Sequence, residues 1–131
     1  MAQPIRVVLV EDNQVFREAL ELLLGLRPEL EVVASVDNGT AAAAIVRDLD
    51  PDVVLMDYRL PGLNGVEATR EIRAAAPDVR VVCLTASVTM REVEELYAAG
   101  AVACLTKDEA LDAIIDAILR AGGDGDGAQW N

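Results

Sequence analysis

The sequence contains no histidine and few aromatic residues: one tryptophan, two tyrosines and one phenylalanine in 131 residues. Without an imidazole, the chain can form neither a Ser-His-Asp triad nor a histidine metal site, so any metal should be a hard cation held by oxygen atoms. The scarcity of rings means that the core must be aliphatic. Hydrophobic residues make up 53% of the chain, which excludes a disordered protein, and the length suits one domain.

Basic residues are also scarce. Eleven lysines and arginines face 23 aspartates and glutamates, for a net charge of −12. This balance argues against binding of nucleic acid or of an anionic membrane by this chain itself. The first four residues lack a basic start, and no apolar run approaches membrane-spanning length. We therefore predict a cytoplasmic protein without membrane contact.

Cysteine occurs twice, as Cys83 and Cys104, and both stand within apolar runs. We interpret them as reduced, buried small hydrophobic side chains. Their spacing is not CxxC, which argues against a redox pair or a metal site.

Short apolar runs alternate with segments of helical periodicity along the chain. The runs predict five strands, at residues 5–10, 32–36, 53–56, 79–84 and 101–105, and the segments predict five helices, at residues 15–24, 40–49, 66–76, 89–99 and from 111 onward. This alternation predicts an α/β fold with one parallel sheet and helices on both faces. Residues 122–131 have no periodicity and four glycines, so we expect a flexible tail or linker there, after a domain that spans residues 1–121.

The stretch from Asp52 to Gly65 contains the first candidate site residue. Residues 53–56 are continuously apolar, as in a parallel strand covered on both faces, and Asp57 follows directly. Ligands of open parallel sheets bind outside the carboxyl ends of the strands. A lone aspartate at a strand end is more often a turn or cap residue, so the significance of Asp57 depends on the other strand ends.

Polar side chains do stand at those ends. Glu11 and Asp12 follow the first predicted strand, Thr85 ends the fourth, and Lys107 follows the fifth. If these strands are neighbours, the side chains converge, and Mg²⁺ would relieve the repulsion between the carboxylates. A carboxylate beside Mg²⁺ can be a nucleophile that forms an acyl phosphate. A lysine ammonium and a threonine hydroxyl can stabilise the charged phosphoryl oxygens.

These residues stand at the spacing of a known family. The marks are the pair Glu11-Asp12, the motif Asp57-x-x-Leu60-Pro61-x-x-Asn64-Gly65, the pair Thr85-Ala86, and Lys107. With them the chain resembles a response-regulator receiver domain of two-component signalling over about residues 5–121. The resemblance implies a doubly wound, flavodoxin-like sheet with strand order 2-1-3-4-5. The phrasing around Gly100-Ala101 and Lys107-Asp108 is most similar to NarL/FixJ (LuxR-type) regulators, which join a receiver to a helix-turn-helix output domain.

The resemblance implies how phosphoryl transfer would occur. Asp57 would accept a phosphoryl group from the phosphohistidine of a sensor histidine kinase. Asp12 and Asp57 would hold Mg²⁺ together with the backbone carbonyl of Arg59. Glu11 would act from slightly further away, through a water. The chain would be a phosphoprotein switch and not a metabolic enzyme, with weak autophosphorylation from small phosphodonors and weak auto-dephosphorylation.

The resemblance also implies roles around the phosphoryl group. Lys107 would pair with Asp57 and then with the phosphoryl oxygens, and Thr85 would swing in to donate a hydrogen bond. Small Ala86 would leave access to the site, while Arg59 and Ser87 would influence how long the phosphoryl group lasts. Phosphorylation would control homodimerisation or an output domain that regulates transcription, and DNA would be contacted only through such a domain, which this chain lacks.

One position departs from the family pattern. Receivers commonly carry tyrosine or phenylalanine three residues before the site lysine, and that ring changes rotamer when the threonine moves. Here the position is Cys104, and a thiol cannot fill the space of a ring. We expect a muted change at the fifth strand on phosphorylation. The alternative is that the helix before it packs closer and switching proceeds as usual.

Three rival interpretations use related folds or chemistry. A flavin-binding electron carrier would need a loop rich in glycine, serine and threonine after the first strand, where this chain has Glu11-Asp12-Asn13. An aspartyl-phosphate phosphatase would carry a second aspartate two residues after the nucleophile, where this chain has Arg59. A receiver-like binding module without chemistry is disfavoured because the acidic residues, threonine and lysine are all present.

Overall fold

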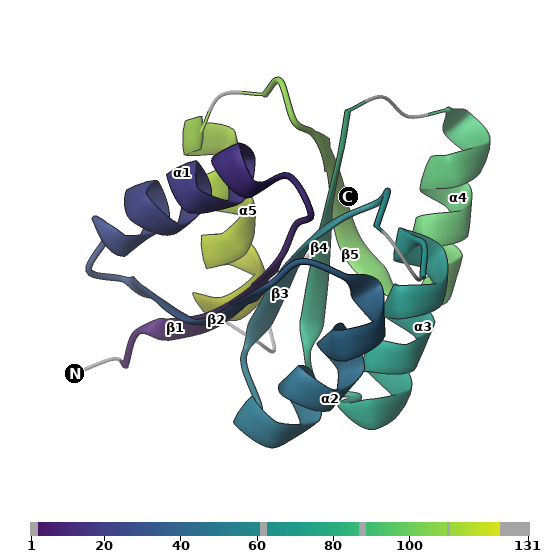
Figure 1. Cartoon of the computed structure of the whole chain (residues 1–131), viewed down its shortest axis with the longest axis horizontal. Coiled ribbons are helices and arrows are strands. Elements are labelled where there is room, and N and C mark those ends of the chain that lie inside the picture. Colours follow the sequence, from purple (N-terminus) through teal and green to yellow (C-terminus); the bar gives the residue numbers. More distant parts are fainter. Residues whose placement is uncertain (1–2, 61–62, 87–88, 110, 124–131) are drawn as a thin grey trace.

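The structure, a computed structural model, describes residues 3–60, 63–86, 89–109 and 111–123. Strands and helices alternate along the chain (Figure 1). The elements are β1 Ile5–Val10, α1 Gln14–Gly25, β2 Leu30–Val36, α2 Gly39–Leu49, β3 Val53–Asp57, α3 Gly65–Ala75, β4 Arg80–Thr85, α4 Met90–Ala99, β5 Ala101–Thr106 and α5 Leu111–Gly123.

The five strands form one parallel sheet in the order β2-β1-β3-β4-β5. This confirms the predicted fold and strand order. β3 lies between β1 and β4, and β5 lies beyond β4. The carboxyl ends of these four parallel strands therefore lie along the same edge of the sheet. The candidate residues of four strands are therefore brought to one edge of the sheet.

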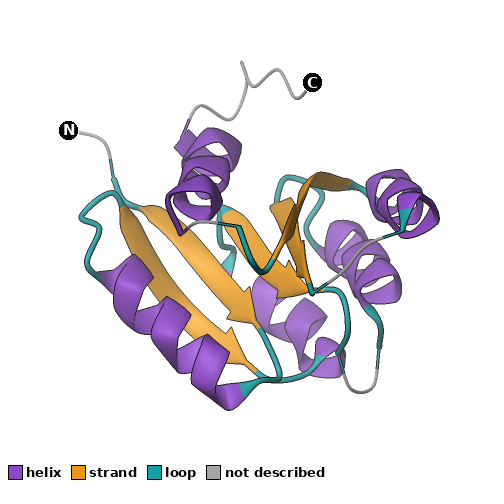
Figure 2. Cartoon of the chain, turned by 90° about the horizontal axis from the view of Figure 1, so that it is seen from above, coloured by secondary structure: helices purple, strands orange, loops and turns teal. Residues whose placement is uncertain are grey.

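Helices cover both faces of the sheet (Figure 2). α1 and α5 pack on one face, where Leu24 and Ile118 contact a cluster that includes Leu55 of β3. α2, α3 and α4 pack on the other, where Ile72 and Leu96 belong to a cluster with Met56. Successive residues of β3 alternate between the two clusters and are fully buried, which explains the unbroken apolar run before Asp57.

Polar caps set the start of the helices after the strand ends. Asn13, Asn38 and Asn64 each accept a hydrogen bond from the backbone amide three residues later. Thr89 and Glu92 form the predicted capping box at α4, each side chain accepting from the other residue's backbone amide. These caps place the first turns of the helices close to the carboxyl edge of the sheet.

Two element boundaries differ from the prediction by two residues. β2 begins at Leu30, two residues earlier than expected, and α5 continues through Gly122 and Gly123, where the tail was predicted to begin. A β-carbon at Gly122 would lie 2.6 Å from Ile5 and 2.9 Å from Val53, so the glycine lets α5 pack closely on β1 and β3. Residues 124–131 lie outside the described part of the chain.

The cysteines differ in burial. Both are free thiols, and Cys83 is buried as predicted. Cys104 is only half-buried, because it lies on β5 at the edge of the sheet. No helix within residues 3–60, 63–86, 89–109 or 111–123 is long and apolar enough to cross a membrane.

Candidate functional site

Glu11 and Asp12 leave the end of β1 in different directions. The amide of Glu11 donates to Val36 at 3.0 Å, which continues the pairing with β2, and its side chain is 1% exposed. Asn13 donates its amide to Glu11 Oε2 at 2.9 Å, and Arg17 of α1 donates to the Glu11 carbonyl at 2.8 Å. Asp12 remains exposed. The edge thus has one inward and one accessible carboxylate.

Asp57 is the last residue of β3, and its side chain is 5% exposed. Its Oδ1 accepts the Arg59 amide at 3.2 Å. Gly65 approaches the backbone of Tyr58 so closely that a β-carbon there would lie 2.8 Å from the Tyr58 Cα, and the Gly65 amide donates to the Tyr58 carbonyl at 2.6 Å. The glycine that ends the sequence motif therefore holds the loop after Asp57.

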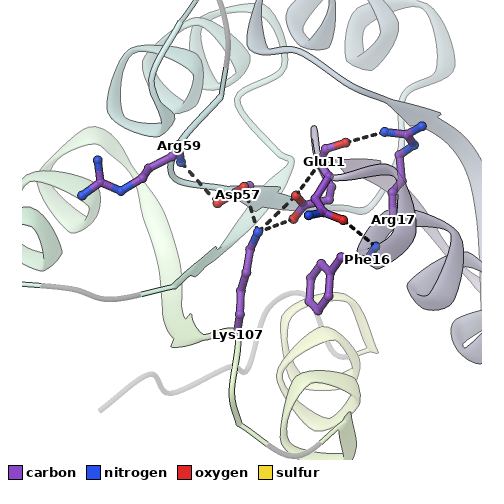
Figure 3. A network of polar contacts seen from close by, with 7 residues as sticks. Glu11, Phe16, Arg17, Asp57, Arg59 and Lys107 are labelled. Atoms are coloured by element: carbon purple, nitrogen blue, oxygen red, sulfur yellow. Dashed lines mark hydrogen bonds and ion pairs between the residues drawn. The ribbon is translucent and has the colours of Figure 1, made fainter.

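Lys107 joins the two inward carboxylates (Figure 3). Its Nζ lies 3.0 Å from Asp57 Oδ2 and 2.9 Å from Glu11 Oε1. The Lys107 amide donates to the Thr85 carbonyl at 2.8 Å, which ties the loop after β5 to the end of β4. Residues from three strand ends thus form one ion-pair network.

Phe16 is a site residue that the sequence did not point to. Its ring, on α1, lies 4.8 Å from the Lys107 Nζ (Figure 3), within the range of a cation–π contact. The chain contains a single phenylalanine, and it lies against the lysine of the cluster. No sequence motif marks this contact, since it depends on how α1 packs against β1 and β2.

Burial and ion pairing act in opposite directions on the two charges. Burial raises the pKa of Glu11, and the nearby Asp57 charge adds to the rise, while hydrogen bonds from Lys107 and Asn13 oppose it. Burial alone would lower the pKa of Lys107, but its hydrogen bonds to Glu11 and Asp57 outweigh that effect and raise it. Lys107 is therefore held in its charged form, whereas burial destabilises the charged form of Glu11.

The acidic residues have the donor set of a hard cation. Carboxylate oxygens of Glu11, Asp12 and Asp57 lie within 4.8 Å of one another. Glu11 Oε1 is buried and, among the described residues, receives no hydrogen bond of suitable geometry, even though the Lys107 ammonium is near. Carboxylate oxygens at this spacing fit Mg²⁺.

The remaining predicted residues lie around this cluster. Thr85 is fully buried at the end of β4 and Ala86 is exposed just after it. The Arg59 side chain points away from Asp57 and lies 3.9 Å from Glu92 of α4. Ser87 lies outside the described residues. Beside the cluster is a cleft of about 460 Å³, lined by Asp12, Tyr58, Arg59, Leu60, Asn64 and Glu92.

The family model of the response regulator receiver domain matches residues 7–119. The transcriptional regulatory protein DegU of Brevibacillus brevis is 40% identical over 114 residues, which cover 87% of this chain and 48% of DegU. The chain spans about half the length of the curated relatives it matches.

Solved structures give the same picture. The signal receiver domain assigned to the response regulator NarL of Mycobacterium tuberculosis matches with a TM-score of 0.88 and 31% identity, over 94% of this chain and 99% of that one. The receiver domain of the sensor histidine kinase PA1611 of Pseudomonas aeruginosa PAO1 matches with a TM-score of 0.81 and 32% identity, over 92% and 99% of the two chains. That structure has a magnesium ion coordinated in its active-site cleft.

Proposed function

Because this chain belongs to the response regulator receiver domain family, as its motifs predicted, we propose that Asp57 accepts a phosphoryl group from a sensor histidine kinase. The observation that carries the proposal is the position of Asp57, buried at the end of β3 with Lys107 3.0 Å away and two further carboxylates within reach. The phosphorylated chain would control self-association or an output domain, and through it transcription.

The proposed chemistry assigns a task to each group. A carboxylate oxygen of Asp57 attacks the phosphorus of a phosphohistidine, the P–N bond breaks, and the imidazole leaves with a proton. The Lys107 ammonium moves from the Asp57 carboxylate to the phosphoryl oxygens, which now carry the negative charge. The Thr85 hydroxyl turns to donate a hydrogen bond to one of these oxygens. Ala86 presents only a methyl group at the entrance.

Mg²⁺ would be held by the carboxylates of Asp12 and Asp57 and by the Arg59 carbonyl, with Glu11 acting through a water. When bound, this ion would supply positive charge to the phosphoryl oxygens and offset the repulsion between the carboxylates. Exposed Asp12 would admit the ion from solvent, because it borders the open cleft beside the site.

Dephosphorylation would be slow in this proposal. The place two residues after Asp57 holds Arg59, whose side chain points toward Glu92 and offers no base to an attacking water. Arg59 and Ser87 would set the lifetime of the phosphoryl group by controlling access. The chain is then a switch with weak autophosphorylation and auto-dephosphorylation, acting in the cytoplasm beside its kinase.

Self-association has an available surface. Among the described residues, α1 exposes Val15, Leu22 and Leu23, with Leu26 directly after it, and α4 exposes Met90 and Tyr97. A phosphorylation-dependent homodimer would use the face that includes α1 and α5 or the face formed by α4, β5 and α5. With a net charge of −12, this chain repels DNA phosphates, so DNA contact would require an output domain.

Phosphorylation with acetyl phosphate and Mg²⁺ tests the proposal. Intact-mass spectrometry of the full chain should show one added phosphoryl group, which alkali removes. Asp57→Asn should abolish it, whereas Asp52→Asn, at the opposite end of β3, should leave it unchanged. Retention of the modification in Asp57→Asn would move the nucleophile elsewhere, and an unmodified parent chain would contradict the proposal.

A further inference from the structure

The two cysteines are neighbours across the sheet, although they are far apart in sequence. Cys83 of β4 and Cys104 of β5 are register partners in adjacent parallel strands. Both lie on the face covered by α3 and α4, where Cys83 belongs to the buried cluster and Cys104 packs against it. Neighbouring strands lie about 4.8 Å apart, which is within the roughly 4.4–6.8 Å between α-carbons that a disulfide spans.

The pair has one protected and one accessible member. Cys83 is completely buried and its sulfur lies 4.0 Å from the Thr69 hydroxyl. Cys104 is half-buried and lines a cavity of about 470 Å³ together with Tyr97 and Arg120. A small oxidant would therefore reach Cys104 first, and Cys83 would then be the nearby resolving thiol.

We propose that Cys83 and Cys104 form a reversible intrachain disulfide when a peroxide reaches Cys104, and that this bond restrains the phosphorylation switch. The regulatory half of the proposal rests on the proposed function of Asp57. Cys83 and Cys104 lack CxxC spacing along the chain, but the register of β4 and β5 brings them side by side.

The reaction balances with a peroxide as oxidant. The Cys104 sulfur attacks one peroxide oxygen, an S–O bond forms as the O–O bond breaks, and the products are a sulfenic acid and, from hydrogen peroxide, one water. The Cys83 sulfur then attacks the Cys104 sulfur, an S–S bond forms as the S–O bond breaks, and a second water leaves. Two thiols lose two electrons and the peroxide gains them.

The resting state is protected against accidental oxidation. Burial raises the pKa of Cys83 to about 12 and also raises that of Cys104, so few thiolates are present near neutral pH. Oxidation is therefore slow and needs sustained exposure to peroxide. This behaviour suits a bond that forms only under oxidative stress in a reducing compartment.

The position of the bond connects it to the site. Thr85 follows Cys83 by two residues, Lys107 follows Cys104 by three, and the Lys107 amide donates to the Thr85 carbonyl at 2.8 Å. A disulfide between these register partners would fix the separation of β4 and β5 next to the two residues. The threonine and lysine ends would then lose the freedom that the switch requires.

Peroxide treatment of the full chain at low protein concentration tests the bond. The expected result is a monomer lighter by two hydrogen atoms, with a Cys83–Cys104 crosslinked peptide that dithiothreitol separates. Cys104→Ser and Cys83→Ala should each prevent the crosslink, and the half-buried Cys104→Ser keeps the core intact. Oxidation of Cys104 to sulfinic acid with Cys83 still a free thiol, or crosslinks between chains only, would overturn the proposal.

The rate of phosphorylation by acetyl phosphate tests the consequence. The oxidised parent should react severalfold more slowly than the reduced parent, and dithiothreitol should restore the rate. Peroxide-treated Cys104→Ser, which cannot form the crosslink, should react as fast as the reduced parent. An unchanged rate in fully crosslinked protein would overturn the regulatory half. If the reduced protein is not phosphorylated at all, the proposed function of Asp57 fails, while the mapped crosslink decides the disulfide independently.

Discussion

The two ends of the sheet differ in how their charged side chains are paired. At the amino end, Arg6 of β1 donates to the carbonyls of Leu49 and Asp50 at 2.6 and 3.0 Å, where α2 ends, and its amide donates to the Asp52 carboxylate at 2.9 Å. At the carboxyl end, three carboxylates lie within 4.8 Å of one another, and Lys107 is paired with two of them. The amino end is arranged for stability, whereas the carboxyl end keeps like charges close together, as the proposed cation site requires.

The site is held together by the rest of the fold. β3 is buried along its length between two apolar clusters, so Asp57 stays beside Glu11 despite their like charges. Lys107 reduces that repulsion without removing it. The comparison predicts that substitutions at the two ends differ in sign and in their response to Mg²⁺.

Lys107→Met should give the largest effect on stability. It removes the ammonium from two buried carboxylates, and breaking a fully buried pair costs roughly 3–5 kcal/mol. Because the Lys107 side chain is 21% exposed, we expect a loss of about 2 kcal/mol in urea unfolding at neutral pH. Added Mg²⁺ should recover part of this loss, and Lys107→Arg should lose less. An equal loss in both variants would show that the charge does not matter.

Arg6→Met should destabilise the amino end by about 1–2 kcal/mol, since it removes hydrogen bonds from a charged donor to two carbonyls. Unlike the loss in Lys107→Met, this loss should be the same with and without Mg²⁺. Arg6→Lys, which keeps the charge, is the matched control and should lose less. A deficit that Mg²⁺ repairs would break the distinction between the two ends.

Glu11→Gln should have the opposite sign and stabilise the metal-free protein, on the order of 1 kcal/mol, because it removes one of three like charges. The raised pKa of Glu11 means that the folded state holds its proton more tightly than the unfolded state. Its stabilising contribution is complete below the unfolded pKa of about 4.3 and is lost as the pH rises through the higher folded pKa.

The advantage of Glu11→Gln should therefore appear above that window and vanish below it. Urea midpoints of both proteins at several pH values measure it. A variant less stable than the parent at neutral pH without Mg²⁺ would mean that Glu11 stabilises the fold through Lys107.

Phe16→Leu should give the smallest effect, about 0.5 kcal/mol, since it removes one cation–π contact at a partly exposed site. NMR signals of the Lys107 side chain are the sharper readout, because the ring shifts them. Phe16→Tyr keeps a ring and should keep these shifts. Unchanged Lys107 signals in Phe16→Leu would place the ammonium elsewhere in solution.

The sequence pattern was sufficient for the strands and for which residues meet at the carboxyl edge, whereas the strand order came from the resemblance to receiver domains. Apolar runs marked the strands, and the polar residue after each run marked its end, as at Asp57 and Lys107. It was insufficient where packing between distant elements decides the outcome. Gly122 begins a glycine-rich stretch whose composition is typical of a tail. It nevertheless belongs to α5, because the absence of a β-carbon lets it pack against Ile5 and Val53.

The same limit applies to side-chain partners. The Phe16 ring faces Lys107 because of the way α1 packs against β1 and β2. That Cys83 would lie beside Cys104 depends on strand register, which shifts once along the β4–β5 pair, between Val81 and Val82. Neither the packing angle nor a register shift leaves a mark in the sequence, so no motif could have predicted these contacts.

The most direct test of the cation site is urea unfolding of the parent chain with increasing Mg²⁺. A ligand that binds the folded state alone raises the stability by about 2.7 kcal/mol at a hundredfold excess over its dissociation constant. We expect the urea midpoint to rise with Mg²⁺ in the parent and in Arg6→Met. It should stay constant in Asp12→Asn and Asp57→Asn. A parent midpoint that does not respond to Mg²⁺, or one that rises equally in Asp12→Asn, would contradict it.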